Sequence, residues 1–200
     1  MNDVTVRPLS AADKDEACRL IGLAFAGHQS TLAIVRGDRG KATRIMRQSA
    51  HIIIDPGSRF RHVLVAEREG RLAGVIHAVE WPHCQLTAGQ KLRTAPALIR
   101  AMGSALPRAM AVTKARAEHE PRKDHWHLGP TAVHPDHQGH GIGTALFGSI
   151  LELADKQGSA AFAQPDADHT VSLCEKFDFK LIAEQEIQGL ATRSMWREAR

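Results

Sequence analysis

The stretch that decides the fold is HLGPTAVHPDHQGHGIGTALF, from His127 to Phe147. It starts with a β-branched, apolar run, and helical periodicity begins after the last of three closely spaced glycines. The first amides of a helix have no partner within the helix, and the helix dipole makes that end partly positive. A loop without Cβ atoms lets an anion approach these amides closely. The pattern therefore indicates either a phosphate-binding turn or a tight strand-to-helix turn without a ligand.

The residues around the loop exclude two familiar phosphate motifs. A nucleoside-triphosphate P-loop ends in Gly-Lys-Ser/Thr, whereas Gly143 is followed here by Thr144 and Ala145. A dinucleotide fingerprint that starts at Gly139 would need its third glycine at Thr144. The loop alone therefore leaves the ligand open.

The composition narrows the class of protein. The 200 residues are 43% hydrophobic and 24% charged, which suits a single globular domain over 1–200. Aromatic residues make up 4% and tyrosine is absent, so we expect no nucleic-acid stacking platform, although the net charge is +4. Apolar runs fall short of the ~20 residues that cross a bilayer. We therefore expect no membrane partner.

The N-terminus and the cysteines bear on the compartment. The segment MNDVTVRPLS lacks an apolar signal core, and the three cysteines show no C-x-x-C spacing. We predict a cytoplasmic protein without a metal site, and the sequence is compatible with a homodimer.

Periodicity and turn residues predict helices and hairpins around one sheet. Ser10 and Asp13 are spaced as a capping box before the first helix. Strands are expected over Val4–Arg7, His62–Glu67, Leu72–Trp81, His125–Val133, Ala160–Gln164, Phe179–Gln188 and Ala191–Arg197. Helices are expected over Ser10–Ala24, Lys41–Ile53, Gln85–Glu118, Thr144–Gly158 and Asp168–Phe177. Only one strand–helix–strand unit is evident, so the fold class is α/β, of the α+β mixed-sheet type.

The segment Gln85–Glu118 is rich in alanine. Ala95, Leu98, Ile99 and Met102 mark one helical face, and Pro107 is expected to break or kink the helix. Leu92, Leu98 and Met102 are compatible with an apolar lid over a binding site or with ordinary core packing.

The flanks of the glycine loop resemble a known family. Thr131-Ala132-Val133-His134-Pro135, followed by Gln138, resembles motif A of the GNAT family of N-acetyltransferases, which is Q/R-x-x-G-x-G/A after a strand. The run HWHLGPTAVHPDHQGHGIGTAL looks like the puromycin-acetyltransferase-like branch, and LCEKFDFKLIAEQEI is similar to the final L-Y-E-K-x-G-F-K segment. The likeness spans nearly the whole chain, and only 85–118 has no fixed counterpart, so it is expected to be a helical insertion. The resemblance implies a GNAT-like fold with a central mixed sheet of about seven strands flanked by helices.

The resemblance also implies that acetyl-CoA is the cofactor and places it on this chain. Its pyrophosphate would lie on the amides from Gly139 to Thr144, and its pantetheine arm would pair with the backbone of 131–133 where parallel strands splay apart. The Val133 N–H would polarise the thioester carbonyl. The implied cofactor-binding residues are Thr131, Ala132, Val133, Gln138, Gly139, His140, Gly141, Ile142, Gly143 and Thr144.

Acetyl transfer to an amine needs a group that removes a proton. His127 is our candidate base, because several GNAT enzymes have a glutamate or histidine at this strand position and an imidazole titrates near neutral pH. The alternative is a structural or partly exposed histidine. Glu80, at the end of the hairpin strand, is a second candidate, and its alternative is a solvated carboxylate.

The main departure from the family pattern concerns the residue that would protonate the leaving thiolate. Cys174 stands where the family has its acidic tyrosine, Asp178 replaces the usual glycine, and Thr170 stands where related sequences often have asparagine. Cys174 could donate a proton to the thiolate, or it could be a small buried hydrophobic residue.

The sequence therefore favours an N-acetyltransferase that acts on the primary amine of a small molecule. Two alternatives remain: a catalytically weak or inactive acyl-CoA sensor, suggested by the missing tyrosine, and a protein acetyltransferase for lysine or N-terminal amines.

Overall fold

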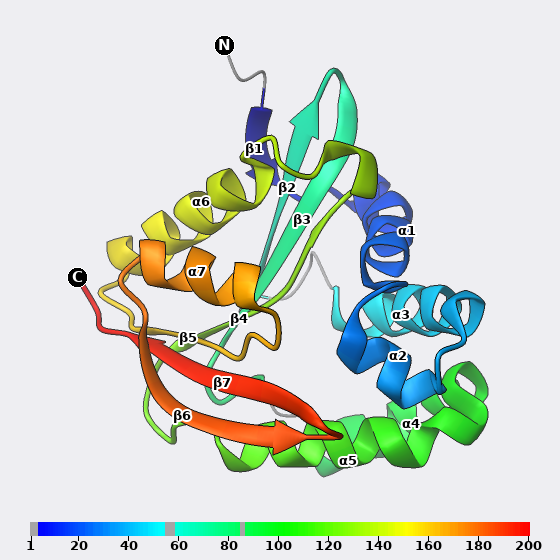
Figure 1. The fold of residues 1–200 in the computed structure, drawn as a ribbon. Helices are drawn as coiled ribbons and strands as arrows, with labels where there is room; N and C mark the ends of the chain where they lie inside the picture. Colours follow the sequence, from blue (N-terminus) through cyan, green and yellow to red (C-terminus); the bar gives the residue numbers. More distant parts are fainter. Residues whose placement is uncertain (1–3, 55–58, 85–86) are drawn as a thin grey trace.

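The computed structural model describes residues 4–54, 59–84 and 87–200 (Figure 1). The strands are β1 (Val4–Pro8), β2 (Arg61–Arg68), β3 (Arg71–Glu80), β4 (Trp126–Val133), β5 (Ala161–Ala163), β6 (Lys180–Ile187) and β7 (Leu190–Arg197). The α-helices are α1 (Lys14–Phe25), α2 (Gln29–Val35), α3 (Arg39–Ile53), α4 (Ala88–Met102), α5 (Leu106–Glu118), α6 (Ile142–Lys156) and α7 (Asp168–Lys176). Short 3-10 turns η1 (Ala11–Asp13), η2 (Gly103–Ala105) and η3 (Pro135–His137) precede α1, α5 and the glycine loop.

Among the described residues, the strands form one mixed sheet of seven, in the order β1-β2-β3-β4-β5-β7-β6. Only β4 and β5 pair in parallel, because α6 connects them as a crossover, and the other neighbours are antiparallel. This confirms the predicted fold class of a mixed sheet flanked by helices.

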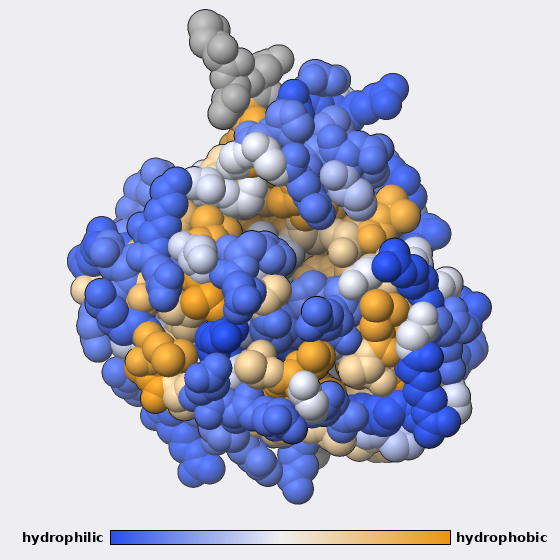
Figure 2. Space-filling view, in the orientation of Figure 1, coloured by the Kyte–Doolittle hydropathy of each residue, from blue (hydrophilic) through white to orange (hydrophobic). Residues whose placement is uncertain are grey.

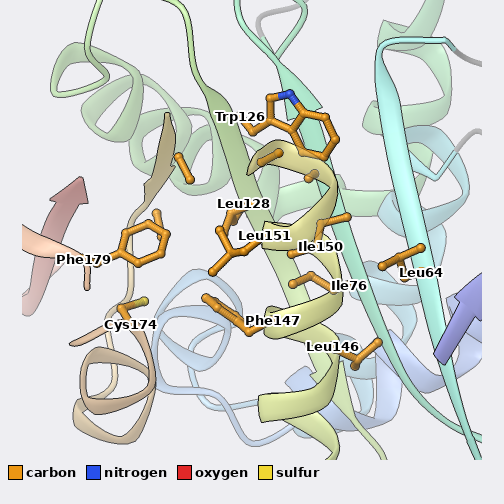
Figure 3. Close-up of a cluster of buried hydrophobic side chains, with 14 of the residues drawn as sticks. Leu64, Ile76, Trp126, Leu128, Leu146, Phe147, Ile150, Leu151, Cys174 and Phe179 are labelled. Carbon is orange, nitrogen blue, oxygen red and sulfur yellow. The ribbon is translucent and has the colours of Figure 1, made fainter. Parts of the chain in front are cut away.

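Helices cover both faces of the sheet (Figure 1). On one face, α6 buries Ile142, Leu146 and Ile150 against Ile76 and its strand neighbours (Figure 3). On the other face, α1 packs Leu20 and Ile21 against strand residues and against α3. The glycine loop lies at the point where β4 leaves the sheet and α6 begins, so the core of the fold fixes its position.

The helices differ from the sequence expectation in two places. Helix α2 lies between the first two expected helices, where no helix was expected, because its seven residues are too few to show a clear apolar period. In α4 the expected apolar face is buried only in part: Met102 packs against a small core cluster with Val35 and Ile45, whereas Ile99 is 56% exposed. Leu92, which was compatible with an apolar lid, is 79% exposed. The helical segment is interrupted at Gly103–Ala105, and Pro107 then occupies the first turn of α5, where its missing N–H is tolerated.

The predicted capping box is present, because the Ser10 N–H donates to the Asp13 carboxylate at 3.0 Å. Asp55-Pro56-Gly57 is a turn signal that predicts the end of the second helix, and it lies outside the described residues. In the described part of the chain, no single helix is long and apolar enough to span a membrane; Ala11–Phe25 and Gln29–Val35 pass that test only as a pair bent by 87°.

Candidate active site

The glycine loop presents open amides at the N-terminus of α6. Gly139 and Gly141 both have φ of +79°, the left-handed conformation that side chains with a Cβ rarely adopt. Ala145 donates to the Gly141 carbonyl at 2.9 Å, so Ile142, Gly143 and Thr144 precede the regular helical ladder. A Cβ added at Gly139 would meet nothing within 4 Å, and one at Gly143 would meet only Leu173 and Val133 side-chain atoms at 3.9 Å, so the loop is not crowded at either glycine. An anion can therefore reach these amides.

Gly74 brings α6 close to the sheet. A Cβ at Gly74 would lie 2.7 Å from Ile142 Cγ2 and 2.9 Å from Leu146 Cδ1. The first turn of α6 thus rests on bare backbone of β3, and this sets where the loop amides point. Sequence reasoning missed Gly74, since a single glycine in a strand does not reveal which helix lies above it.

Beside the loop, β4 has a free backbone edge. Its parallel pairing with β5 ends at Leu128 and Ala163, so 129–133 have no strand partner on that side within the described residues. The backbone N–H of His134 donates to the carbonyl of Ala73 in β3 at 2.8 Å. Because successive backbone N–H groups of a strand point to opposite sides, the N–H of Val133 points away from β3, toward the open side. The side chain of Gln138 crosses the same turn, donating to the Val133 carbonyl at 3.4 Å.

A β-bulge in β4 separates the two faces of the site. The register with β3 shifts by one residue in the middle of the strand. Leu128 packs in the cluster beneath α6, whereas Ala132 packs with α1, although a regular strand would place both on one face. Beyond the bulge Val133 therefore faces α6, while His127, before it, faces away from α6.

His127 lies against a carboxylate that the sequence did not single out. Its Nδ1 donates to Oε1 of Glu120 at 2.5 Å, and His125 Nε2 is 3.5 Å from the same oxygen, which is longer than a hydrogen bond of normal length. The Cys84 thiol also donates to this carboxylate. Burial opposes the charge on Glu120, but these contacts outweigh it and hold the pKa of the carboxyl below its ordinary range. His125 and His127 both approach this carboxylate, so they share one face.

Glu80 does not join this group. His62 on β2 donates to Glu80 Oε1 at 2.8 Å and stacks on the indole of Trp126, with ring centroids 3.9 Å apart. Glu80 is the cross-strand partner of Trp126, so its side chain is on the face opposite His127. The carboxylate is neither freely solvated nor close to the candidate base.

Cys174 lies in the hydrophobic core beside Phe179 (Figure 3). Its exposure is 0%, and burial raises the pKa of the thiol to about 12. This environment favours the interpretation of Cys174 as a small buried hydrophobic residue over that of a proton donor.

Beyond the end of β5, three segments meet at Asp166. Its carboxylate accepts a hydrogen bond from Arg116 of α5 at 2.8 Å and contacts Nε2 of His28, between α1 and α2, at 3.3 Å. Burial lowers the pKa of His28 below its ordinary value. Figure 2 shows a hollow with apolar patches near the middle of the face that it displays, inside a hydrophilic surround.

Comparison with known proteins agrees with this architecture. A family model described as "Acetyltransferase (GNAT) family" matches residues 37–179. A Corynebacterium glutamicum structure, described as histone acetyltransferase HPA2 and related acetyltransferase, superposes with a TM-score of 0.73 and 21% identity over 99% of this chain and 97% of that chain.

Two further structures are similar in fold. The Drosophila melanogaster polyamine N-acetyltransferase, which catalyses the formation of N-acetylagmatine, has a TM-score of 0.62 at 12% identity, covering 98% of this chain and 100% of its own. A Salmonella typhimurium protein solved with its cofactor acetyl-CoA has a TM-score of 0.57 at 16% identity, covering 98% and 94%.

Proposed function

The chain belongs to the acetyltransferase (GNAT) family, and on this premise we propose that it is an acetyl-CoA-dependent N-acetyltransferase that acts on the primary amine of a small molecule. The amine attacks directly, with both substrates bound at once. The observation that carries the proposal is the open amide loop at α6 beside the unpaired edge of β4. We retain a place in the puromycin-acetyltransferase-like branch and a cytoplasmic location as parts of the proposal.

The residues present fit coenzyme A. The amides from Gly139 to Thr144 would hold its pyrophosphate, and each hydrogen bond to a charged group contributes about 1.5–3 kcal/mol. The backbone of 131–133 would pair with the pantetheine arm. Acetyl-CoA would supply the acetyl group as a reactive thioester. The Val133 N–H, turned toward the open edge, would donate to the carbonyl oxygen as charge develops there.

His127 is the proposed proton acceptor for the attacking amine. With Nδ1–H donated to Glu120, the lone pair of the ring lies on Nε2, and the carboxylate stabilises the positive charge that the ring gains with a proton. Glu120 acts here as a positioning residue, because it acts through His127. Cys174 has no role in this proposal, since a thiolate can depart unprotonated or take its proton from water.

The acceptor would enter on the face of His28 and Asp166, opposite the cofactor. The helices of the proposed insertion at 85–118 border this side through Arg116. Structural neighbours that act on agmatine and polyamines support a small amine as the acceptor class.

One alternative has a specific observation behind it. The chain contains no tyrosine, and the cysteine at the family's acid position is fully buried, which suits an inactive acyl-CoA sensor. A protein acetyltransferase would instead need an open groove, which the helices at 85–118 disfavour.

The deciding experiment measures coenzyme A release from acetyl-CoA against a panel of mono-, di- and polyamines, with a chelator present. Turnover with any small amine, absent in a His127→Ala variant, supports the proposal. Tight acetyl-CoA binding without turnover on the panel supports the sensor, and turnover with peptides only supports the protein acetyltransferase.

A further inference from the structure

Three metal-ligating side chains converge where α5 turns back into β4. The donor atoms are Oε1 of Glu120, Nε2 of His125 and Nδ1 of His127, and all three lie within 4.8 Å of one another. The side chains of Glu120 and His125 are 5% and 0% exposed, and that of His127 is 26% exposed. The group is therefore nearly closed to solvent.

His125 supplies an independent indication of a bound cation. Its Nδ1 is 2.7 Å from the Lys123 carbonyl, which can only accept, so this nitrogen carries the hydrogen. In the neutral ring Nε2 is then a lone pair. It is buried, makes no hydrogen bond, and faces the Glu120 carboxylate at 3.5 Å. Two acceptors that face each other without solvent repel, and a positive charge between them, either a proton on Nε2 or a metal ion, removes this repulsion.

We propose that Glu120, His125 and His127 bind a divalent transition metal of the zinc type, and that the Cys84 sulfur, which contacts Glu120 but lies outside this close group of three, moves in as the fourth ligand. Imidazole, carboxylate and thiolate are ligands that Zn²⁺ takes in tetrahedral sites. Bonds of about 2.0–2.1 Å separate tetrahedral ligand atoms by roughly 3.3 Å. The Glu120–His125 distance of 3.5 Å already meets this, and the 2.5 Å contact with His127 needs to widen by less than 1 Å. Cys84 reaches the same carboxylate through its thiol.

The surroundings match what metal sites require. Ligating histidines usually donate their second ring N–H to a carbonyl or carboxylate, which fixes the ring, and Lys123 does this for His125. An access route exists as well. Glu120 lines a cavity of about 370 Å³ together with Trp81, Lys114, Ala117, Glu118 and Arg122.

Metal binding would also inhibit catalysis, an inference that rests on the proposed function. A metal on Nδ1 of His127 leaves the hydrogen on Nε2, so the ring has no lone pair for the proton of the amine. The loaded site would therefore be inhibitory, and the metal-free protein would be the active form.

The test uses the full chain, stripped with a chelator and titrated with Zn²⁺ against a chromophoric competitor. Wild type and the matched control Glu118→Gln, which changes a neighbouring carboxyl in the same cavity, should bind one equivalent with equal affinity. Glu120→Gln should bind at least tenfold more weakly while keeping the wild-type circular dichroism spectrum. Equal affinity of Glu120→Gln and wild type would overturn the site, as would binding lost equally in His137→Ala, a half-buried histidine of η3 outside the proposed site.

A spectroscopic arm tests the ligand set without relying on activity. Co²⁺ should give the intense visible bands of a tetrahedral site and a sulfur charge-transfer band that Cys84→Ser abolishes. Weak octahedral Co²⁺ bands would overturn the proposed geometry. If Zn²⁺ binds as expected but leaves acetyl transfer unchanged, the site stands, and the assignment of His127 as base fails instead.

Discussion

Nδ1 of His127 lies 2.5 Å from Oε1 of Glu120, so a strand histidine and a carboxylate just beyond the end of α5 form one hydrogen-bonded pair. The pair is on the face of β4 that points away from α6, whereas the loop proposed for coenzyme A lies under the start of α6. The bulge in β4 separates these two functions within one strand.

We expect the His127–Glu120 pair to accept the proton of the attacking amine. His127→Ala is expected to lower kcat by roughly 10²–10⁴-fold, the usual contribution of a general base. Glu120→Gln should lower kcat by about tenfold, because the ring loses its orienting charge. Both variants should bind coenzyme A as wild type does, measured by calorimetry with a chelator present. His119→Ala, at an exposed neighbour, is the control, and an unchanged kcat in His127→Ala would remove the assignment.

Cys174 should be dispensable for chemistry. Cys174→Ala is expected to keep kcat within about threefold and to lower the free energy of unfolding by about 1–2 kcal/mol, since it leaves a small cavity beside Phe179. Steady-state kinetics and urea denaturation check both parts. A kcat reduced a hundredfold with normal coenzyme A affinity would restore the thiol as the acid.

Gly74 should be needed for the close packing of α6 against β3. Gly74→Ala places a methyl group 2.7 Å from Ile142 Cγ2, so we expect a loss of about 1–3 kcal/mol in stability and weaker coenzyme A binding as the first turn shifts. Gly89→Ala, inside α4 with nothing within 4 Å, is the control and should be neutral or stabilising. Wild-type affinity in Gly74→Ala would show that the loop position does not depend on this contact.

The free energy of unfolding should depend on pH through the ionisation of Asp155. Arg197 donates to both oxygens of Asp155, at 2.7 and 2.8 Å, and this lowers the pKa of the carboxyl from 3.8. The folded state therefore gains stability above the unfolded pKa near 4 and loses it as the pH falls below that value. Asp155→Asn should cost about 2 kcal/mol at neutral pH, because the Arg197 side chain is only 4% exposed, and the difference from wild type should shrink below pH 4.

Denaturation curves at several pH values measure this effect. Asp168→Asn is the matched control: its partner contact with Arg193 is at the surface, with Asp168 92% exposed, so the loss should stay below about 1 kcal/mol. An Asp155→Asn penalty that does not change with pH would contradict the ion-pair account.

Much of the fold could be predicted because local sequence patterns specify its helices and strands. Two apolar runs separated by a short segment with Gly70 marked the β2–β3 hairpin, and the apolar period of α6 marked the helix under which the core forms. The short helix α2 lacked such a pattern. The apolar stripe of α4 was visible, but periodicity does not say which elements will cover it, and Ile99 remains exposed.

The sequence pattern itself points to the proposed site only where the backbone is the functional group, and His127 was singled out only through the family resemblance. The loop glycines could be identified from the sequence, because a positive φ and the lack of a Cβ atom are properties of the residues themselves. Glu120 does not, since its role arises only when the chain reverses after α5 and brings it against β4. Asp178 is an intermediate case: its φ of +65° shows why glycine is usual there.

The most direct test of the central claim is the affinity for coenzyme A of two glycine variants at opposite ends of α6. Gly141, φ +79°, begins the helix, and Gly158, φ +60°, follows its end, so Gly141→Leu and Gly158→Leu introduce comparable backbone strain. Calorimetry should show at least a tenfold loss of affinity in Gly141→Leu and wild-type affinity in Gly158→Leu. Equal affinity in the two folded variants would contradict the account, because the pyrophosphate would then be bound somewhere other than the amides of 138–144.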